Sequence, residues 1–248
     1  MTVLVTRPGE QGISLCHQLN QQGIKAINHP LIAIRAGEQL PCLVKSLPKA
    51  DIIIAVSQHT IEFTHQYLTN ANVSWSKTAT YLAVGQKSAQ FLSKFANQKV
   101  HYPERSDSEN LLKLPQLKNV SGKHIVILRG NGGRELIYDT LVARGAHVEY
   151  CEVYKRENLA FRSEITVPFW QDSQVNQLII TSSGQLNFFI EHIAPPYRDW
   201  VLKLALFVPS ERIAIEARRV GFHTVVNTGS ASNKELLAAL AKETGRKQ

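Results

Sequence analysis

Short apolar runs alternate with stretches of helical periodicity along the chain. Strands are predicted at Ile52–Val56, at Tyr81–Val84 and near Val100. Helical patterns follow them and begin near Thr60, Ser88 and Ser108. Because alternating strands and helices form parallel sheets with helices on both faces, the pattern predicts an α/β fold with doubly wound parallel sheets.

The first part of this pattern occurs twice. Residues 4–34 align without gaps with residues 126–156, so that Arg7 falls on Arg129 and Gly23 on Gly145. Both glycines stand where the C-terminus of a helix favours a left-handed residue. In each copy two leucines have the spacing of one buried helical face, namely Leu15 with Leu19 and Leu136 with Leu141. Later segments match in the same order, so the chain contains an internal duplication.

Two extended, partly charged segments occupy equivalent places in the copies, at residues 31–37 and 151–157. We interpret them as a two-stranded linker between two domains. One domain is then residues 1–34 plus 155–248, and the other is the inserted segment 37–152. A tandem of two domains divided near residue 122 uses the same repeat and is the alternative. A thin linker leaves the domains free to hinge, and we expect the ligand in the cleft between them.

The chain is mildly basic, with 28 Lys and Arg against 20 Asp and Glu in 248 residues and a formal net charge of +8. The excess is +3 within residues 36–152 and +5 in the remainder, so no basic stripe of the nucleic-acid-binding kind is present. A solvated basic surface explains this balance. A small polyanionic ligand is the functional alternative.

The compartment and the class of chemistry follow from what the sequence lacks. No apolar run approaches the roughly 20 residues of a membrane-spanning helix, and no signal-peptide core is present, so we expect a cytoplasmic protein. Cys16, Cys42 and Cys151 lie far apart in no paired spacing, which indicates free thiols rather than disulfides or a zinc site. Nucleophile and metal-ligand motifs are missing, so an enzyme of this sequence would work mainly by positioning its substrate.

A glycine cluster, residues 130–133, follows the strand pattern that ends at Arg129. It does not complete a dinucleotide fingerprint, because Glu135 stands where the third glycine belongs. Glu152 lies near the place of a ribose-binding acid and is equally explained as a linker charge. Arg7 and Arg129 each stand at the carboxyl end of a strand beside a helix start, a combination that binds oxyanions in general.

Polar residues also stand at the other strand ends, where helices begin. A serine at such a place usually caps the helix, which is the simpler explanation for each residue taken alone. The carboxyl ends of strands in α/β folds nevertheless converge on the ligand site. The further candidates for substrate binding are Ser57, Gln58, Lys87, Ser88, Ser182, Ser183, Gly184 and Ser210.

The order and spacing of these segments resemble uroporphyrinogen-III synthases. The resemblance covers essentially the whole chain and rests on the duplicated unit and on "VLVTRP", "IIAVSQHTIEF", "LAVGQKSA", "ILRGNGGRE", "CEVYKR", "LIITSSGQLNFF" and "VPSERIAIEARRVGF". The family converts linear hydroxymethylbilane to uroporphyrinogen III without a metal or cofactor, losing water, inverting the terminal pyrrole ring and closing the macrocycle. The resemblance implies the same reaction here, as a step of haem and sirohaem biosynthesis.

The resemblance also implies roles for single residues. The family's substrate carries acetate and propionate groups on all its rings, so Arg129 and the amides of Gly130, Asn131 and Gly132 are expected to hold carboxylates. Tyr154 matches the linker tyrosine of the family and is the expected proton donor to the leaving hydroxyl group. A tyrosine packed at a domain edge is the alternative interpretation of Tyr154.

Two candidates depart from the pattern of the family. Ser210 stands where many members carry a glycine-proline-hydroxyl turn, so its role in substrate binding is open. Arg7 is followed by Pro8 and Gly9 rather than by the glycine cluster, which leaves a structural role for Arg7 open.

We expect a monomer that takes hydroxymethylbilane, handed over by hydroxymethylbilane synthase, and that has neither nucleic acid nor membrane as a partner. A two-domain binding protein that closes on a polyanionic small molecule without transforming it is the rival interpretation, because a fold alone does not separate the two. A nucleotide-dependent enzyme is disfavoured by the incomplete fingerprint.

Overall fold

The computed structural model describes residues 1–245, with side chains up to residue 242. The chain folds into two compact units: unit 1 is Met1–Ile34 with the chain from Glu157 onward, and unit 2 is Arg35–Arg156. The chain therefore returns from unit 2 to unit 1 between Arg156 and Glu157, a little beyond the boundary expected between residues 152 and 155. Tyr154 belongs to unit 2 together with the glycine cluster.

The elements of unit 1 alternate between strands and helices as the apolar pattern predicts. They are β1 (Thr2–Val5), α1 (Gly9–Gln21), β2 (Lys25–Asn28), α7 (Ser163–Asp172), β9 (Val175–Ile179), α8 (Ser183–Glu191), α9 (Pro195–Leu202), β10 (Ala205–Val208), α10 (Glu211–Val220), β11 (Thr224–Asn227) and α11 (Asn233–Gly245). Its five-stranded sheet has the order β11-β10-β9-β1-β2 with parallel neighbours throughout.

Unit 2 is built in the same way. Its elements are α2 (Leu43–Ser46), β4 (Ile52–Ala55), α3 (Gln58–Asn70), β5 (Thr80–Ala83), α4 (Gln86–Ala96), β6 (Val100–His101), α5 (Ser108–Leu111), β7 (His124–Gly130) and α6 (Leu136–Ala143), with short 3-10 turns at Leu40–Cys42, Leu47–Lys49 and Pro115–Leu117. The short strand β3 (Ile32–Ala36) and the 12-residue strand β8 (His147–Asn158) complete the six-stranded sheet of order β3-β8-β7-β4-β5-β6.

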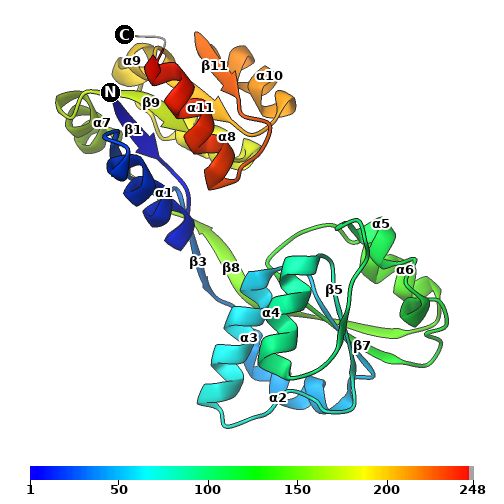
Figure 1. Ribbon diagram of the computed structural model, residues 1–248. Coiled ribbons are helices and arrows are strands. Elements are labelled where there is room, and N and C mark those ends of the chain that lie inside the picture. Colours follow the sequence, from blue (N-terminus) through cyan, green and yellow to red (C-terminus); the bar gives the residue numbers. More distant parts are fainter. Residues whose placement is uncertain (246–248) are drawn as a thin grey trace. The chain divides into compact units, whose positions relative to one another are not determined.

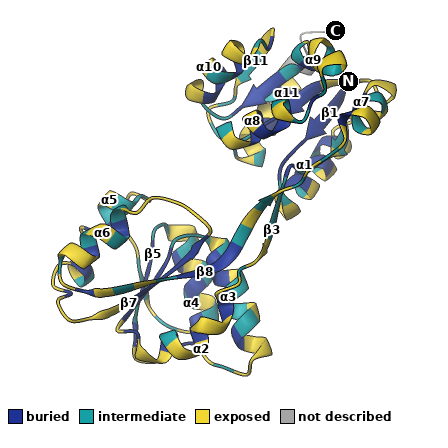
Figure 2. Cartoon of the chain, turned by 180° about the vertical axis from the view of Figure 1, so that it is seen from behind, coloured by how far each residue is buried: buried dark blue, intermediate teal, exposed yellow. Residues whose placement is uncertain are grey.

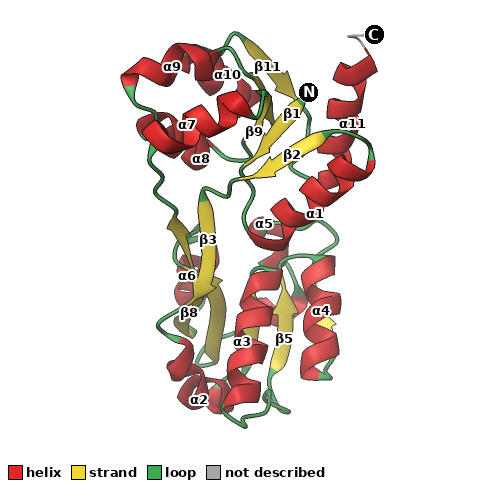
Figure 3. Cartoon of the chain, turned by 90° about the vertical axis from the view of Figure 1, so that its left-hand side faces the viewer, coloured by secondary structure: helices red, strands yellow, loops and turns green. Residues whose placement is uncertain are grey.

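The duplication is visible in the strand orders. The series β2-β1-β9-β10-β11 of unit 1 corresponds to β8-β7-β4-β5-β6 of unit 2. In each unit the first two strands of one copy of the repeat, β1 and β2 or β7 and β8, lie beside three strands of the other copy. In unit 2, helices α3 and α4 cover one face of the sheet and α5 and α6 the other (Figures 1 and 3). The predicted class, two doubly wound parallel α/β sheets, is confirmed.

Strands β3 and β8 carry the chain between the units and lie side by side (Figure 1). The amide of Leu159 donates to the carbonyl of Leu31 over 2.8 Å, and the amide of Gly37 donates to the carbonyl of Val153 over 2.9 Å. Because the residue numbers rise on one strand while they fall on the other, the two strands run antiparallel. This is the predicted two-stranded linker.

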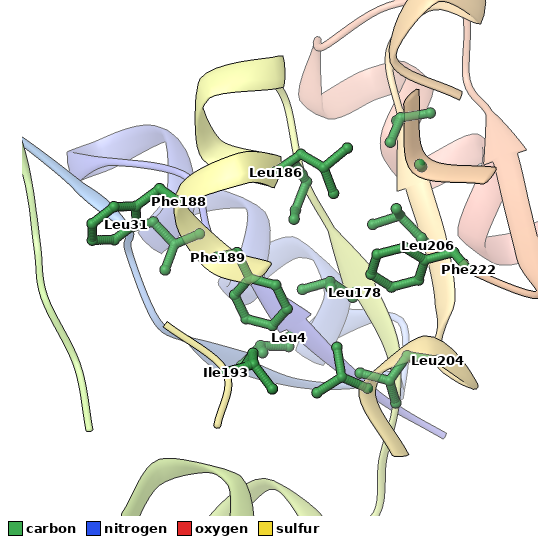
Figure 4. Close-up of a cluster of buried hydrophobic side chains, with 14 of the residues drawn as sticks. Leu4, Leu31, Leu178, Leu186, Phe188, Phe189, Ile193, Leu204, Leu206 and Phe222 are labelled. Atoms are coloured by element: carbon green, nitrogen blue, oxygen red, sulfur yellow. The ribbon is translucent and has the colours of Figure 1, made fainter. Parts of the chain in front are cut away.

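The central strands of each sheet are buried (dark blue in Figure 2), and most of their buried side chains are apolar. In unit 1, Leu4, Leu178 and Leu206 of three neighbouring strands pack against Leu186 and Phe189 of α8 (Figure 4). Each such side chain contributes roughly 1.5–3 kcal/mol when it is fully buried. The opposite face of this sheet packs against α1 and α11.

Several local predictions can be compared with the structure directly. Gly23 and Gly145 follow α1 and α6 with φ of +74° and +81°, the left-handed conformation expected of them. Leu15, Leu19 and Leu141 are fully buried as predicted. Leu136, the first residue of α6, packs against the same core cluster as Leu141 but is only half-buried, whereas its neighbour Ile137 is buried.

Helices α3 and α4 begin at Gln58 and Gln86, two residues before the predicted Thr60 and Ser88, whereas α5 begins at Ser108 as predicted. Within residues 1–245 no helix is long and apolar enough to cross a membrane. The three cysteines are free, with Cys42 exposed and the other two buried.

Candidate functional site

A pocket of about 240 Å³ lies within unit 2, at the carboxyl end of its sheet. It is lined by the residues that follow β4 and β5, by the end of β7, by β8 and by the loop before α6. Among the predicted site residues it gathers Ser57, Arg129, Gly130, Gly132 and Tyr154. A larger, open hollow of about 610 Å³ at the opposite end of this sheet contains none of the predicted residues.

Arg129 is buried at the end of β7 and paired with an acidic residue of the protein. Its Nη1 lies 2.9 Å from Oε1 of Glu135, and its Nε donates to the carbonyl of Gly130 over 3.2 Å. The guanidinium also lies 4.2 Å from the centre of the Tyr150 ring, and the Tyr150 hydroxyl donates to Oε2 of Glu135 over 2.7 Å. A substrate carboxylate that reaches Arg129 must therefore share it with Glu135 or displace Glu135.

The charges of this cluster are coupled. The hydrogen bond from Tyr150, followed by that from Arg129, holds the pKa of Glu135 below its ordinary value. Burial, together with the neighbouring Glu135 carboxylate, raises the pKa of Tyr150. Desolvation acts to lower the pKa of Arg129, but the bond to Glu135 and the charge interactions with Tyr150, Glu135 and Glu152 together outweigh it and leave that pKa raised. The cluster is therefore an ion pair with a neutral phenol at neutral pH.

The loop of the glycine cluster differs from the prediction in one respect. Helix α6 begins only at Leu136, so residues 130–132 do not form its first turn. The amide of Asn131 donates to the carbonyl of Tyr154 over 3.1 Å, and the amide of Gly132 donates to that of Gly130 over 2.8 Å. Both amides therefore have partners within the chain, and their part in holding substrate carboxylates stays a prediction.

Glycine is needed in this loop for its backbone conformation. Gly132 and Gly133 have φ of +125° and +137°, which L side chains rarely adopt. A Cβ at Gly132 would meet no atom within 4 Å, so lack of space is not the reason.

Asn131 fastens the loop to strand β8. Its Oδ1 accepts from the amide of Arg156 over 2.7 Å, and its Nδ2 donates to the carbonyl of Arg156 over 3.2 Å. The main-chain amide of Asn131 bonds to Tyr154, and its side chain bonds to Arg156. Asn131 therefore holds the main chain of β8 on both sides of Lys155. The structure thus gives Asn131 a bracing role.

Tyr154 is 3% exposed and its ring lies against the backbone of β7. A Cβ built on Gly130 would lie 2.6 Å from Cε2 of this ring, so only glycine fits opposite it. The ring of Phe63 stacks at 6.2 Å between centroids, and that of His59 makes an edge contact at 5.7 Å. Nη2 of Arg156 donates to the Tyr154 hydroxyl over 3.1 Å.

The other candidates of unit 2 lie at helix starts. Ser57 caps α3 by accepting from the amide of Thr60 over 3.4 Å, and it also lines the pocket. Gln58 and Lys87 are exposed, and Ser88 is half-buried in the first turn of α4. None of these last three lines the pocket of about 240 Å³.

In unit 1, Arg7 is buried and joins two helices. It donates to Oε1 of Gln11 over 2.6 Å, in the first turn of α1, and to Oδ1 of Asn233, the first residue of α11. Burial lowers the pKa of Arg7. These contacts favour the structural role that the sequence left open.

The remaining candidates of unit 1 lie at the starts of α8 and α10. Ser182 caps α8 by accepting from the amide of Gln185 over 3.2 Å, and Ser183 accepts from Nη1 of Arg212 over 2.7 Å. Gly184 has open space around it, and Ser210 precedes α10 without a side-chain cap bond. Their part in substrate binding stays a prediction.

Sequence reasoning missed several residues that line the pocket, namely Ser108, Arg134, Tyr150 and Arg156. Arg134 is paired with Glu109 of α5. Arg156 is two residues after Tyr154 on β8, and even spacing on a strand places side chains on one face, so that spacing could have found Arg156. The pairing of β8 with β7 shifts its register between Tyr150 and Tyr154, and Tyr150 stacks on Tyr138 of α6 whereas Tyr154 contacts Phe63 of α3, so spacing alone could not have found Tyr150.

Known proteins match the chain over nearly its whole length. The family profile described as "Uroporphyrinogen-III synthase HemD" matches residues 14–238. The uroporphyrinogen-III synthase of Escherichia coli is 40% identical over 245 residues, which cover 97% of this chain and 100% of that protein. This chain belongs to the uroporphyrinogen-III synthase family. The enzyme of the same name from Salmonella typhimurium is 38% identical over the same shares of both chains.

Solved structures of uroporphyrinogen-III synthases have the same fold. A mutant enzyme of Thermus thermophilus covers all of both chains with a TM-score of 0.62 at 17% identity. The enzyme of Helicobacter pylori gives a TM-score of 0.54 at 13% identity and covers 97% of this chain and 98% of its own. The family predicted from the sequence is confirmed.

Proposed function

We propose that this protein is a uroporphyrinogen-III synthase, a cyclising lyase of tetrapyrrole biosynthesis. It converts hydroxymethylbilane to uroporphyrinogen III with loss of water and inversion of the terminal pyrrole ring. The observation that carries the proposal is the 40% identity to the Escherichia coli enzyme over 97% of this chain and the whole of that one. The fold agrees with it.

The first chemical event is departure of the hydroxyl group. The pyrrole nitrogen supplies the electron pair that expels it, so the protein need only protonate the leaving oxygen. We propose Tyr154 as the proton donor, since this residue lines the pocket and its ring is fixed between Gly130 and Phe63. Tyrosine suits this role because its phenol is protonated at neutral pH.

The protein must also control which of the two ring closures occurs, and therefore which isomer forms. Uncatalysed closure gives the uninverted type I isomer, so the enzyme has to fold the bilane so that the spiro intermediate forms first. This is a task of positioning. The pocket supports it with Arg129 and Arg134, whose guanidinium groups can bind acetate and propionate groups of the substrate.

We further propose that the protein acts as a cytoplasmic monomer without metal or cofactor. It would receive hydroxymethylbilane from hydroxymethylbilane synthase and have no nucleic acid partner. The spread of the +8 net charge without a basic stripe supports the last point.

Product analysis tests the proposed function. The purified protein is mixed with freshly prepared hydroxymethylbilane, the porphyrinogens are oxidised, and the isomers are separated by chromatography, with heat-denatured protein as the blank. Predominantly type III product is expected. Type I product alone, formed at the rate of the blank, would refute the synthase and leave a protein that binds a polyanion without transforming it.

A further inference from the structure

Arg156 is held beside Tyr154 by contacts on both its main chain and its side chain. The side chain of Asn131 bonds the amide and the carbonyl of Arg156 over 2.7 and 3.2 Å. The guanidinium lies with Nη2 3.1 Å from the hydroxyl oxygen of Tyr154 and with its central carbon 5.6 Å from the centre of the ring. Both residues line the pocket of unit 2. An exposed arginine is thus fixed against a buried phenol.

The chemistry of the two groups fixes the direction of this hydrogen bond. A guanidinium has donors but no acceptor, so the phenol oxygen accepts from Arg156. The proton of the phenol is then left to point elsewhere. The ring cannot turn toward β7, because Gly130 has no room for even a Cβ beside it, and Phe63 stacks on it. Since Tyr154 and Arg156 both line the pocket, an acceptor bound there can take this proton.

A positive charge at this place also matches the charge that develops during proton transfer. When Tyr154 gives up its proton, a phenolate remains 3.1 Å from Nη2 of Arg156. A charge that is already in position stabilises such an anion without reorganisation. The other two arginines of the pocket are bonded to carboxylates, Arg129 to Glu135 and Arg134 to Glu109.

We infer that Arg156 is a positioning residue for the proposed reaction. It directs the Tyr154 proton toward the leaving hydroxyl group and stabilises the phenolate. In this step the carbon–oxygen bond of the hydroxymethyl group breaks, the electron pair leaves with oxygen, and the phenol proton converts it to water. The pyrrole carries the positive charge until ring closure, after which the proton that is lost restores the phenol. The inference rests on the proposed function and on Tyr154 as donor.

The test measures kcat and KM for type III product in Arg156→Gln, Arg156→Lys, Tyr154→Phe and the double variant Arg156→Gln with Tyr154→Phe. A general acid typically contributes about 10²–10⁴-fold to the rate. We expect kcat of Arg156→Gln to be about tenfold lower than that of the wild type, because the acid is weakened but still present, and KM to change by less than about threefold. Lysine keeps the charge and a donor, so Arg156→Lys should recover part of the loss. Without the phenol, Arg156→Gln should lower kcat by less than about twofold.

Lys155→Gln is the matched control. Lys155 is the neighbour of Arg156 in the chain, and its side chain pairs with Glu38 and does not line the pocket. Lys155→Gln removes one positive charge, as Arg156→Gln does, and should leave kcat unchanged. Thermal melts of every variant show whether the fold is kept.

Three outcomes would overturn the inference. A rise of KM with unchanged kcat would make Arg156 a carboxylate ligand, and an equal loss of kcat in the presence and absence of the phenol would make its effect independent of Tyr154. Wild-type kcat in Arg156→Gln would refute it as well. In each case type III product from the wild-type protein leaves the proposed function standing, whereas its absence removes both.

Discussion

Replacing Gly130 by alanine tests whether the Tyr154 ring is held by the backbone of β7. The added Cβ would lie 2.6 Å from Cε2 and 2.9 Å from Cε1 of the ring. Ordinary carbon contacts are about 3.5–4.0 Å, so the ring must move by about 1 Å. A displacement of about 1 Å at a reacting group lowers kcat by roughly 100-fold. The overpacking should also cost about 1–3 kcal/mol in the free energy of unfolding.

The assay combines kcat for type III product with denaturant unfolding followed by circular dichroism. In a Tyr154→Ala background the ring is gone, so Gly130→Ala should add little further destabilisation while kcat stays low. Gly184→Ala is the control for stability, because a Cβ there meets no atom within 4 Å. The reasoning is wrong if Gly130→Ala keeps wild-type kcat and stability, or if its cost is the same with and without the ring.

Three further variants test other parts of the site. Arg7→Ala should lower the free energy of unfolding by about 1–3 kcal/mol and leave KM unchanged, because Arg7 is buried and bonded to Gln11; a raised KM at unchanged stability would instead make Arg7 a substrate ligand. Arg129→Ala should raise KM by about two- to fivefold, because a carboxylate that binds Arg129 gains only the difference from its bond to Glu135, and an unchanged KM would contradict substrate binding by Arg129. Glu135→Gln addresses pH. The pKa of Glu135 is held below its ordinary 4.5, so its stabilisation is complete above pH 4.5 and is lost as the pH falls through the lowered pKa. The wild-type melting temperature should then fall more steeply on acidification than that of Glu135→Gln, and parallel curves would contradict this.

The apolar pattern was sufficient to predict the fold because the central strands of both sheets are buried on both faces. Runs such as Ile52–Ala55 have no exposed residue, and a continuous apolar run of this length is typical of a parallel sheet between helices. The left-handed glycines Gly23 and Gly145 were predictable for a local reason, since helix ends of this type require that conformation. The duplication supplied the long-range information that periodicity lacks.

The contacts inside the site could not be predicted in the same way. The pairing of Arg129 with Glu135 depends on the conformation of a loop with two glycines at positive φ, and many conformations of such a loop are compatible with the same sequence. The partners of the Asn131 and Gly132 amides depend on that loop as well. Sequence spacing identifies the end of the sheet to which a residue belongs, but it does not determine the atom that the residue contacts.

The internal pairing of the arginines in the pocket has a consequence for substrate affinity. Arg129 is bonded to Glu135, and Arg134 to Glu109. A substrate carboxylate that reaches one of them replaces an existing partner, so it gains only the difference between two charge-assisted hydrogen bonds. One carboxylate then gains little, whereas a ligand with acetate and propionate groups on every ring adds several such differences. The same pairing also spares the protein an unpaired buried charge at Arg129 when no substrate is bound. The pairing itself therefore makes the pocket specific for a ligand with many carboxylates. Acetate alone should protect the protein against thermal unfolding far less than the bilane does.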